Sequence, residues 1–192
     1  MALFKTESIT IQKEDPDQIF SSPDDNDFVI CKNPTKLMAL INSLAAHKSI
    51  WYVSDGDWSM HDLIMQLLKQ YNPADLFITT YALREFSVRQ LILAQDRKEI
   101  SSVNMVLDYR AQVRTPEVYQ LASLNLNKIY LTGIHAKVTV LKTADVSISI
   151  VGSANWTNNP RIEAGVISMN KELAEFNISW IKKVMENAEI FN

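Results

Sequence analysis

Glycine and cysteine are scarce in this chain of 192 residues, which has four glycines and a single cysteine, Cys31. One cysteine cannot form an intramolecular disulfide, and no CxxC or HExxH pattern is present to hold zinc. Four glycines leave no GxGxxG or GxxxxGKS/T loop for a nucleotide phosphate. No apolar run approaches the ~20 residues of a membrane span, and the N-terminus MALFKTESIT lacks a signal-peptide core. We therefore expect a cytoplasmic protein without stable membrane association.

Charge is distributed unevenly along the chain. Residues 1–27 carry seven acids and two lysines, which leaves 15 acids and 17 bases for residues 28–192, a net charge of +2. We expect an acidic N-terminal extension over residues 1–30 and one domain over residues 31–192. The extension has the turn chemistry of a solvated arm. The alternative is a regulatory arm whose carboxylates mimic phosphate over a basic groove.

Strand-like and helix-like periodicities alternate after residue 28. Short segments rich in Val, Ile, Tyr and Phe predict strands at 27–31, 50–54, 76–81, 103–109, 128–131, 136–141, 146–151 and 165–169. Amphipathic spacing predicts helices at 59–71, from Thr115 onward, and at 171–190. Ser59 with Asp62 has the spacing of a capping pair. This order predicts a single-domain α/β fold, with a mixed, largely parallel β-sheet sandwiched between helices.

A candidate catalytic site lies in residues 133–165, which hold three of the four glycines. His135 and Lys137 share one face of a predicted strand, and Ser153 and Asn155 share a face at the end of the next. If these strands pair, an imidazole, an ammonium, a hydroxyl and an amide converge, a group suited to binding and attacking a phosphodiester. Glu163 is placed to accept a hydrogen bond from the His135 ring and fix its tautomer.

The pattern His135-x-Lys137, Asp145, Gly152-Ser153-x-Asn155 and Glu163 resembles the motif of the phospholipase D superfamily. Seven residues separate Lys137 from Asp145 where the family usually has four, which lengthens the hairpin. The motif occurs once, as in the small bacterial nucleases of that family, which are homodimers. The resemblance therefore implies a homodimer whose site uses both copies.

By the same resemblance, one His135 attacks phosphorus to give a phosphohistidine, and the second protonates the leaving oxygen. Lys137, Ser153 and Asn155 would hold the phosphoryl oxygens, with no cofactor and no metal. The implied activity is a metal-independent phosphodiesterase, most plainly a DNA endonuclease, because a net positive body suits backbone phosphates. The alternatives are a phosphatidyl hydrolase or transferase acting on lipid, and an idle subunit that binds nucleic acid or a protein partner.

Two further residues beside the motif have open interpretations. Trp156 is either a core residue or an aromatic platform on which a base stacks. Arg161 is close enough in sequence to contact a phosphate. The other two histidines, His47 and His61, have no such context, and we expect them to be structural or on the surface.

Overall fold

The computed structural model describes residues 19–21, 26–30, 38, 41–42, 44, 49–54, 56, 58–158 and 160–190. Its strands are β1 (Ile19–Ser21), β2 (Asn26–Ile30), β3 (Ser49–Val53), β4 (Ala74–Thr80), β5 (Ile100–Asp108), β6 (Lys128–Thr132), β7 (Val138–Lys142), β8 (Ser147–Gly152), β9 (Ala164–Ser168) and β10 (Glu189–Ile190). Its helices are α2 (Met60–Leu68), α3 (Glu85–Asp96), α4 (Ala111–Arg114), α5 (Pro116–Asn125) and α6 (Lys171–Glu186).

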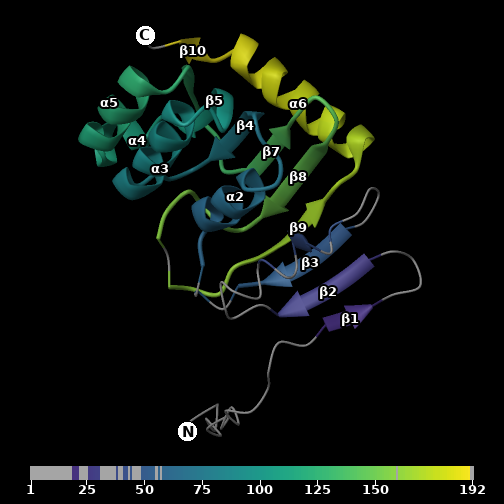
Figure 1. The fold of residues 1–192 in the computed structure, drawn as a ribbon. Coiled ribbons are helices and arrows are strands. Elements are labelled where there is room, and N and C mark those ends of the chain that lie inside the picture. Colours follow the sequence, from purple (N-terminus) through teal and green to yellow (C-terminus); the bar gives the residue numbers. More distant parts are fainter. Residues whose placement is uncertain are drawn as a thin grey trace, which may run out of the picture.

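The strands form one mixed sheet in the order β1-β2-β3-β9-β8-β7-β4-β5-β6-β10 (Figure 1). The predicted α/β class and the mixed sheet are confirmed. The expected excess of parallel pairs needs correction, because the described strands make six antiparallel pairs and three parallel ones. A tight turn joins β7 to β8, and such a connection permits only antiparallel pairing.

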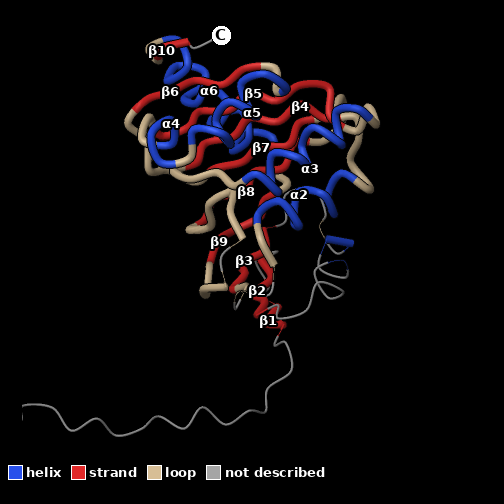
Figure 2. Tube along the Cα trace, turned by 90° about the vertical axis from the view of Figure 1, so that its left-hand side faces the viewer, coloured by secondary structure: helices blue, strands red, loops and turns tan. Residues whose placement is uncertain are grey.

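Helices cover both faces of the sheet (Figure 2). On one face, buried side chains of α2, α3 and α5 pack with alternate residues of the central strands, including Leu76, Ile78, Met105 and Leu107. On the other face, α6 packs against the intervening residues, which include Phe77, Val106, Val138 and Val140. Because side chains alternate across a strand, β4 and β5 are buried on both faces and read as continuous apolar runs.

The predicted capping pair at α2 is present: the Ser59 side chain accepts from the Asp62 backbone N–H, and Asp62 accepts from the Ser59 N–H. Helix α6 ends at Glu186, and Glu189 starts β10, so the helix is shorter than the expected range of 171–190. Sequence periodicity missed α3, because its apolar face is weak: only Val88, Leu91 and Ala94 join the core.

Strands β1 and β2 fall within the expected N-terminal extension and hydrogen-bond into the sheet, β2 running parallel to β3. The division at residue 30 stays a prediction. Cys31 and His47 lie outside the described residues.

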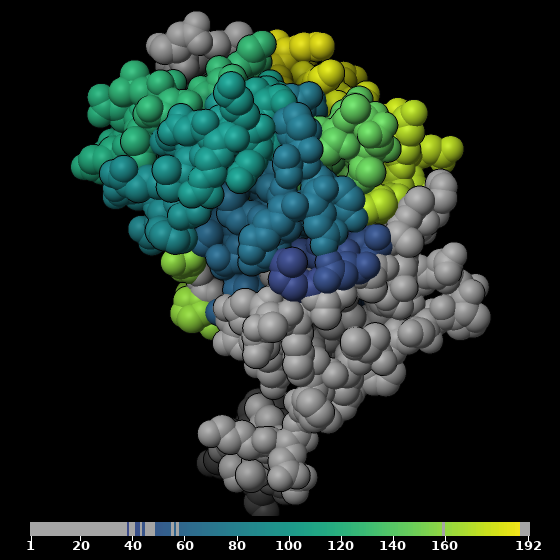
Figure 3. Space-filling model, viewed as in Figure 1, coloured from purple at the N-terminus to yellow at the C-terminus, as the bar shows by residue number. Residues whose placement is uncertain are grey.

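One edge of the sheet collects the chain segments of the predicted site. Strands β4, β5 and β6 are parallel and end at this edge, while β7 and β9 begin there and β8 ends there. The segment between β8 and β9 protrudes from the body at this edge (Figures 1 and 3). The topology thus brings residues 80–84, 108–114, 133–137 and 152–163 to one edge of the sheet.

Two glycines let β8 and β9 approach a tyrosine. Gly152 pairs with Gly165, and the buried Tyr52 hydroxyl lies over both. A Cβ on Gly165 would come within 2.7 Å of Tyr52 Oη and of the Val151 carbonyl oxygen, well inside contact distance. At Gly133, by contrast, a Cβ would meet only the Tyr109 ring, at an ordinary 3.6 Å.

We therefore expect Gly165→Ala to lower the free energy of unfolding by about 1–3 kcal/mol, because the β8–β9 pair must shift to admit a methyl group. Urea denaturation followed by circular dichroism measures this. Gly133→Ala is the matched control and should change stability by less than about 0.5 kcal/mol. Equal losses in the two variants would show that the close approach is unimportant.

Candidate functional site

The residues predicted from sequence meet in one open cavity of about 640 Å³. His135, Lys137, Ser153, Asn155 and Glu163 all line it. They lie in the segment before β7 and in the loop between β8 and β9, so the expectation that each pair shares the face of a strand needs correction. Pairing of β7 with β8 places Val138 opposite Val151, which sets the two halves of the motif side by side.

His135 is exposed, whereas Lys137 is 8% exposed. The Lys137 Nζ donates to the His135 carbonyl oxygen at 2.6 Å and lies 3.1 Å from Nδ1 of the ring. Burial lowers the pKa of Lys137, and the negative charge of Glu163 opposes that shift. The site therefore holds an ammonium that is partly stripped of water, next to an accessible imidazole.

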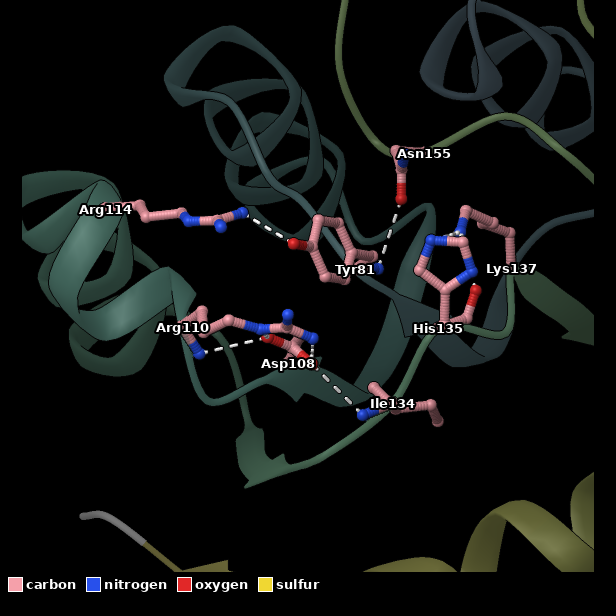
Figure 4. Close-up of polar contacts among 8 residues, drawn as sticks. All are labelled: Tyr81, Asp108, Arg110, Arg114, Ile134, His135, Lys137 and Asn155. Carbon is pink, nitrogen blue, oxygen red and sulfur yellow. Dashed lines mark hydrogen bonds and ion pairs between the residues drawn. The ribbon is translucent and has the colours of Figure 1, made fainter.

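The Asn155 side chain is held by the segment that follows β4. Its Oδ1 accepts from the Tyr81 backbone N–H at 3.2 Å and from the Thr80 hydroxyl at 3.3 Å. With its oxygen occupied in this way, the amide turns its N–H₂ group elsewhere, which makes Asn155 available as a donor. Figure 4 shows the amide reaching toward Tyr81 above His135.

Ser153 and Glu163 form a pair at the mouth of the cavity. The Ser153 hydroxyl donates to Glu163 Oε2, and the Ala164 N–H donates to Ser153 Oγ at 3.1 Å. The expected hydrogen bond between Glu163 and the His135 ring stays a prediction. The Glu163 charge also combines with burial to raise the pKa of Tyr52 beneath the loop, which keeps that phenol neutral.

A further group of side chains lies on the other side of His135, of which sequence reasoning considered Arg110 for the substrate groove and missed Tyr81, Asp108 and Arg114. The Tyr81 ring meets the imidazole edge-on, with ring centroids 5.0 Å apart. The Arg110 guanidinium lies 4.7 Å from the Tyr81 centroid, and Arg114 Nη1 donates to the Tyr81 hydroxyl at 2.6 Å. Figure 4 shows Tyr81 between His135 and Arg114. Their position at strand ends is the one signal that singles out Tyr81 and Arg110 in the sequence.

Asp108 anchors this group. Its side chain is fully buried and accepts two hydrogen bonds from the Arg110 guanidinium, at 2.6 and 2.9 Å. It also accepts from the backbone N–H of Ile134, at 3.2 Å, one residue before His135. The Arg110 hydrogen bonds, opposed by burial, hold the pKa of Asp108 below its usual value. One carboxylate thus ties the end of β5 to the segment that carries the imidazole.

Of the three further candidate residues, one lines the cavity of His135 and two do not. Asp145 lies in the β7–β8 turn at the opposite edge of the sheet and lines a different cavity, so it does not meet the site. Trp156 is 1% exposed and donates through Nε1 to the Thr139 hydroxyl. Its ring belongs to the core and has no free face on which a base could stack. Arg161 is exposed and lines the same cavity as His135.

The other described histidine is part of the core. His61 is 2% exposed, its ring lies within hydrogen-bond distance of Ser59 and Ser87, and burial lowers its pKa. No three His, Cys, Asp or Glu side chains cluster for a metal ion in the part of the chain that the structure describes. No helix in those same residues is long and apolar enough to span a bilayer.

The architecture matches solved structures of phospholipase D proteins. The chain resembles a phospholipase D family member, Nuc from Salmonella typhimurium, with a TM-score of 0.61 and 16% identity over 76% of this chain and 98% of that one. It resembles NucT from Helicobacter pylori with a TM-score of 0.60 and 20% identity, over 75% of this chain and 99% of that one.

A polyphosphate kinase from Porphyromonas gingivalis gives a TM-score of 0.55 at 15% identity, covering 80% of this chain and 27% of that one. The sequence matches no protein-family model and no curated protein. This chain shares the fold of these structures, a phospholipase D-like fold, as the motif resemblance predicts.

Substitution of Asp108 tests whether the charge of its buried carboxylate stabilises the fold. A carboxylate whose pKa is lowered on folding contributes stability above its unfolded pKa, near 3.9, and loses it as the pH falls through the folded value. We expect Asp108→Asn to lower the free energy of unfolding clearly at pH 7 and by progressively less as the pH falls below about 3.9. Urea denaturation across pH measures the difference.

Asp145→Asn is the matched control, because Asp145 is exposed in a turn remote from this group. It should leave stability nearly unchanged at every pH. A pH-independent loss in Asp108→Asn would mean that the side chain contributes through shape and not through its charge.

Proposed function

We propose that this protein is a metal-independent phosphodiesterase that cleaves DNA at a site shared by two copies of the chain. The observation that carries the proposal is the single cavity that gathers His135, Lys137, Ser153 and Asn155. It combines an exposed imidazole with a cation and neutral donors. These are the groups that an in-line displacement at phosphorus needs around its equatorial oxygens.

The proposed reaction has two displacement steps. A His135 nitrogen forms a bond to phosphorus while the phosphorus–oxygen bond to the leaving group breaks, and the imidazolium of a second His135 gives that oxygen a proton. Water then attacks phosphorus, the phosphorus–nitrogen bond breaks, and the second imidazole takes the proton from water. Lys137 and Asn155 bind the non-bridging oxygens, where negative charge increases in the transition state.

A second copy is proposed because, among the described residues, one chain supplies one histidine to the cavity. The other described histidine, His61, is buried in the core and cannot reach a substrate. We therefore infer that the acid opposite the nucleophile comes from a second copy of the chain. A twofold dimer in which the two cavities face each other supplies it with no further residue type.

The surface around the cavity suits such a contact. Ile162, on its rim, is 68% exposed, and Val151, also on its rim, is 36% exposed. Strand register places Val151 beside Val166, and Val166 beside Trp51, which is 50% exposed. This row extends the apolar surface from the rim across three strands. Contiguous exposed apolar side chains of this kind are typical of protein–protein contacts.

The direct test is nicking of supercoiled plasmid in EDTA, with hydrolysis of bis(p-nitrophenyl) phosphate as the measure of the chemistry itself. We expect both activities, and we expect His135→Ala to lower the rate by about a thousandfold or more, since the ring makes the covalent bond. Loss of activity in EDTA that Mg²⁺ restores would contradict the mechanism. Cleavage of phosphatidylcholine vesicles without cleavage of plasmid would assign the site to lipid.

Subunit mixing tests the shared site. After exchange with an equal amount of His135→Ala chains, a site that needs both histidines retains about a quarter of the wild-type activity, because a quarter of random dimers have both. Independent sites would retain about half. Light scattering should give the mass of a dimer, and an active monomer would contradict the shared site.

The Lys137–Glu163 electrostatics predict a pH effect. Because Glu163 opposes the burial that lowers the pKa of Lys137, its neutralisation lets the ammonium lose its proton at a lower pH. We expect Glu163→Gln to shift the alkaline limb of the kcat/KM profile to lower pH and to leave the dimer intact. The control is Glu172→Gln, an exposed change on α6. An unshifted limb in Glu163→Gln would remove Glu163 from the site's electrostatics.

A further inference from the structure

A second cavity, of about 410 Å³, lies on the far side of Tyr81 from His135. Three arginines line it: Arg84 before α3, Arg114 at the end of α4, and Arg161 in the loop before β9. None of its described lining residues is acidic. The other polar side chains on its wall, apart from Tyr81, are Thr115, Thr157 and Asn158, which are neutral hydrogen-bonding groups.

The positive charge of this cavity is not neutralised within the described part of the chain. There the ion pairs are those of His61, Arg89, Arg110 and Lys171, so Arg84, Arg114 and Arg161 have no carboxylate partner. Glu85, which follows Arg84, is paired with Arg89 on the exposed side of α3, at 2.7 Å, and Glu163, two residues after Arg161, accepts from Ser153 in the catalytic cavity. Three exposed guanidinium groups with no described acid paired to them leave a local excess of positive charge that attracts an anion.

Two helix termini add to the field. Arg84 and Thr115 are the N-cap residues of α3 and α5, and in neither helix does a side chain cap the first turn. The Thr115 hydroxyl instead donates a hydrogen bond to the Ala111 carbonyl oxygen, at 3.2 Å. Both helices therefore begin beside the arginines, and each has one acid in its first turn, Glu85 in α3 and Glu117 in α5, that offsets part of its dipole.

This cavity shares part of its wall with the cavity of the candidate catalytic site. Arg161 lines both cavities, and the Tyr81 ring has the His135 imidazole on one side and the Arg114 guanidinium at its hydroxyl. An anion bound here would be the neighbour of a phosphate bound beside His135. In a nucleic acid, one nucleoside joins each phosphate to the next. Two successive phosphates of one strand would therefore occupy the two cavities together.

Resting on the proposed function, we propose that the cavity lined by Arg84, Arg114 and Arg161 binds the backbone phosphate adjacent to the scissile one. The substrate is then a polynucleotide strand with at least two consecutive phosphates. A lone diester such as a phospholipid headgroup would occupy the catalytic cavity and leave the arginine cavity empty. The arginine cavity thus selects nucleic acid over lipid through a second anion, without contact to a base.

Arg84→Gln tests this, because Arg84 lines the arginine cavity and does not line the cavity of His135. We expect about tenfold weaker binding of a fluorescein-labelled single-stranded oligonucleotide, the effect of one charge-assisted hydrogen bond. The slope of log K against log salt should fall by about 0.7, the value for one phosphate contact on a single strand. Fluorescence anisotropy across a KCl series measures both.

Arg89→Gln is the matched control, since it removes the same charge from α3 outside the cavity. It should keep the wild-type affinity and salt slope, and thermal unfolding should show that both variants fold. If Arg84→Gln and Arg89→Gln give the same salt slope, the proposal is wrong.

Hydrolysis of bis(p-nitrophenyl) phosphate, which has one phosphate, separates this proposal from the proposed function. The ratio of kcat/KM for the oligonucleotide to that for the small diester should fall about tenfold in Arg84→Gln. An unchanged ratio would show that Arg84 acts on the scissile phosphate and would overturn the second site. A wild-type protein that hydrolyses neither substrate, yet binds the strand through Arg84, would overturn the phosphodiesterase and support the second site.

Discussion

The buried carboxylate of Asp108 is the interaction on which the geometry of the site depends. It lies at the end of β5 and binds the Arg110 guanidinium and the Ile134 backbone N–H together. A carboxylate without exposed surface requires such partners, because without them no hydrogen bonds would replace those it loses to water on burial. Its need for hydrogen bonds therefore fixes both Arg110, which lies over Tyr81, and the segment that presents His135.

The electrostatics of the edge follow from this arrangement. Asp108 forms an ion pair with Arg110, and Glu163 accepts a hydrogen bond from Ser153. Lys137, Arg114 and Arg161 have no described acid in ion-pair contact. The surface around His135 thus has more positive than negative charge, although the whole chain has a formal net charge of -3. A local excess of this kind attracts an anion more strongly than the net charge suggests, because salt screens charges within about 8–10 Å of the anion less than distant ones.

The antiparallel strands β7, β8 and β9 make the site possible within an α/β fold. Parallel strands alone would bring their carboxyl ends to this edge and keep their amino ends away. The reversal at the β7–β8 turn returns the chain, so that the start of β7 and the end of β8 lie together. His135 and Lys137 thereby meet Ser153 and Asn155, while Asp145, in the turn itself, lies at the other edge.

The sequence by itself determined the local features: the α2 capping pair, the apolar runs of β4 and β5, and the turn between β7 and β8. These depend on periodicity and on neighbours within a few residues. Only the tertiary structure decided the burial of Trp156, the antiparallel excess in the sheet and the roles of Tyr81, Asp108 and Arg114. Those depend on contacts between segments far apart in the chain, such as Asp108 with Ile134, which no local pattern encodes.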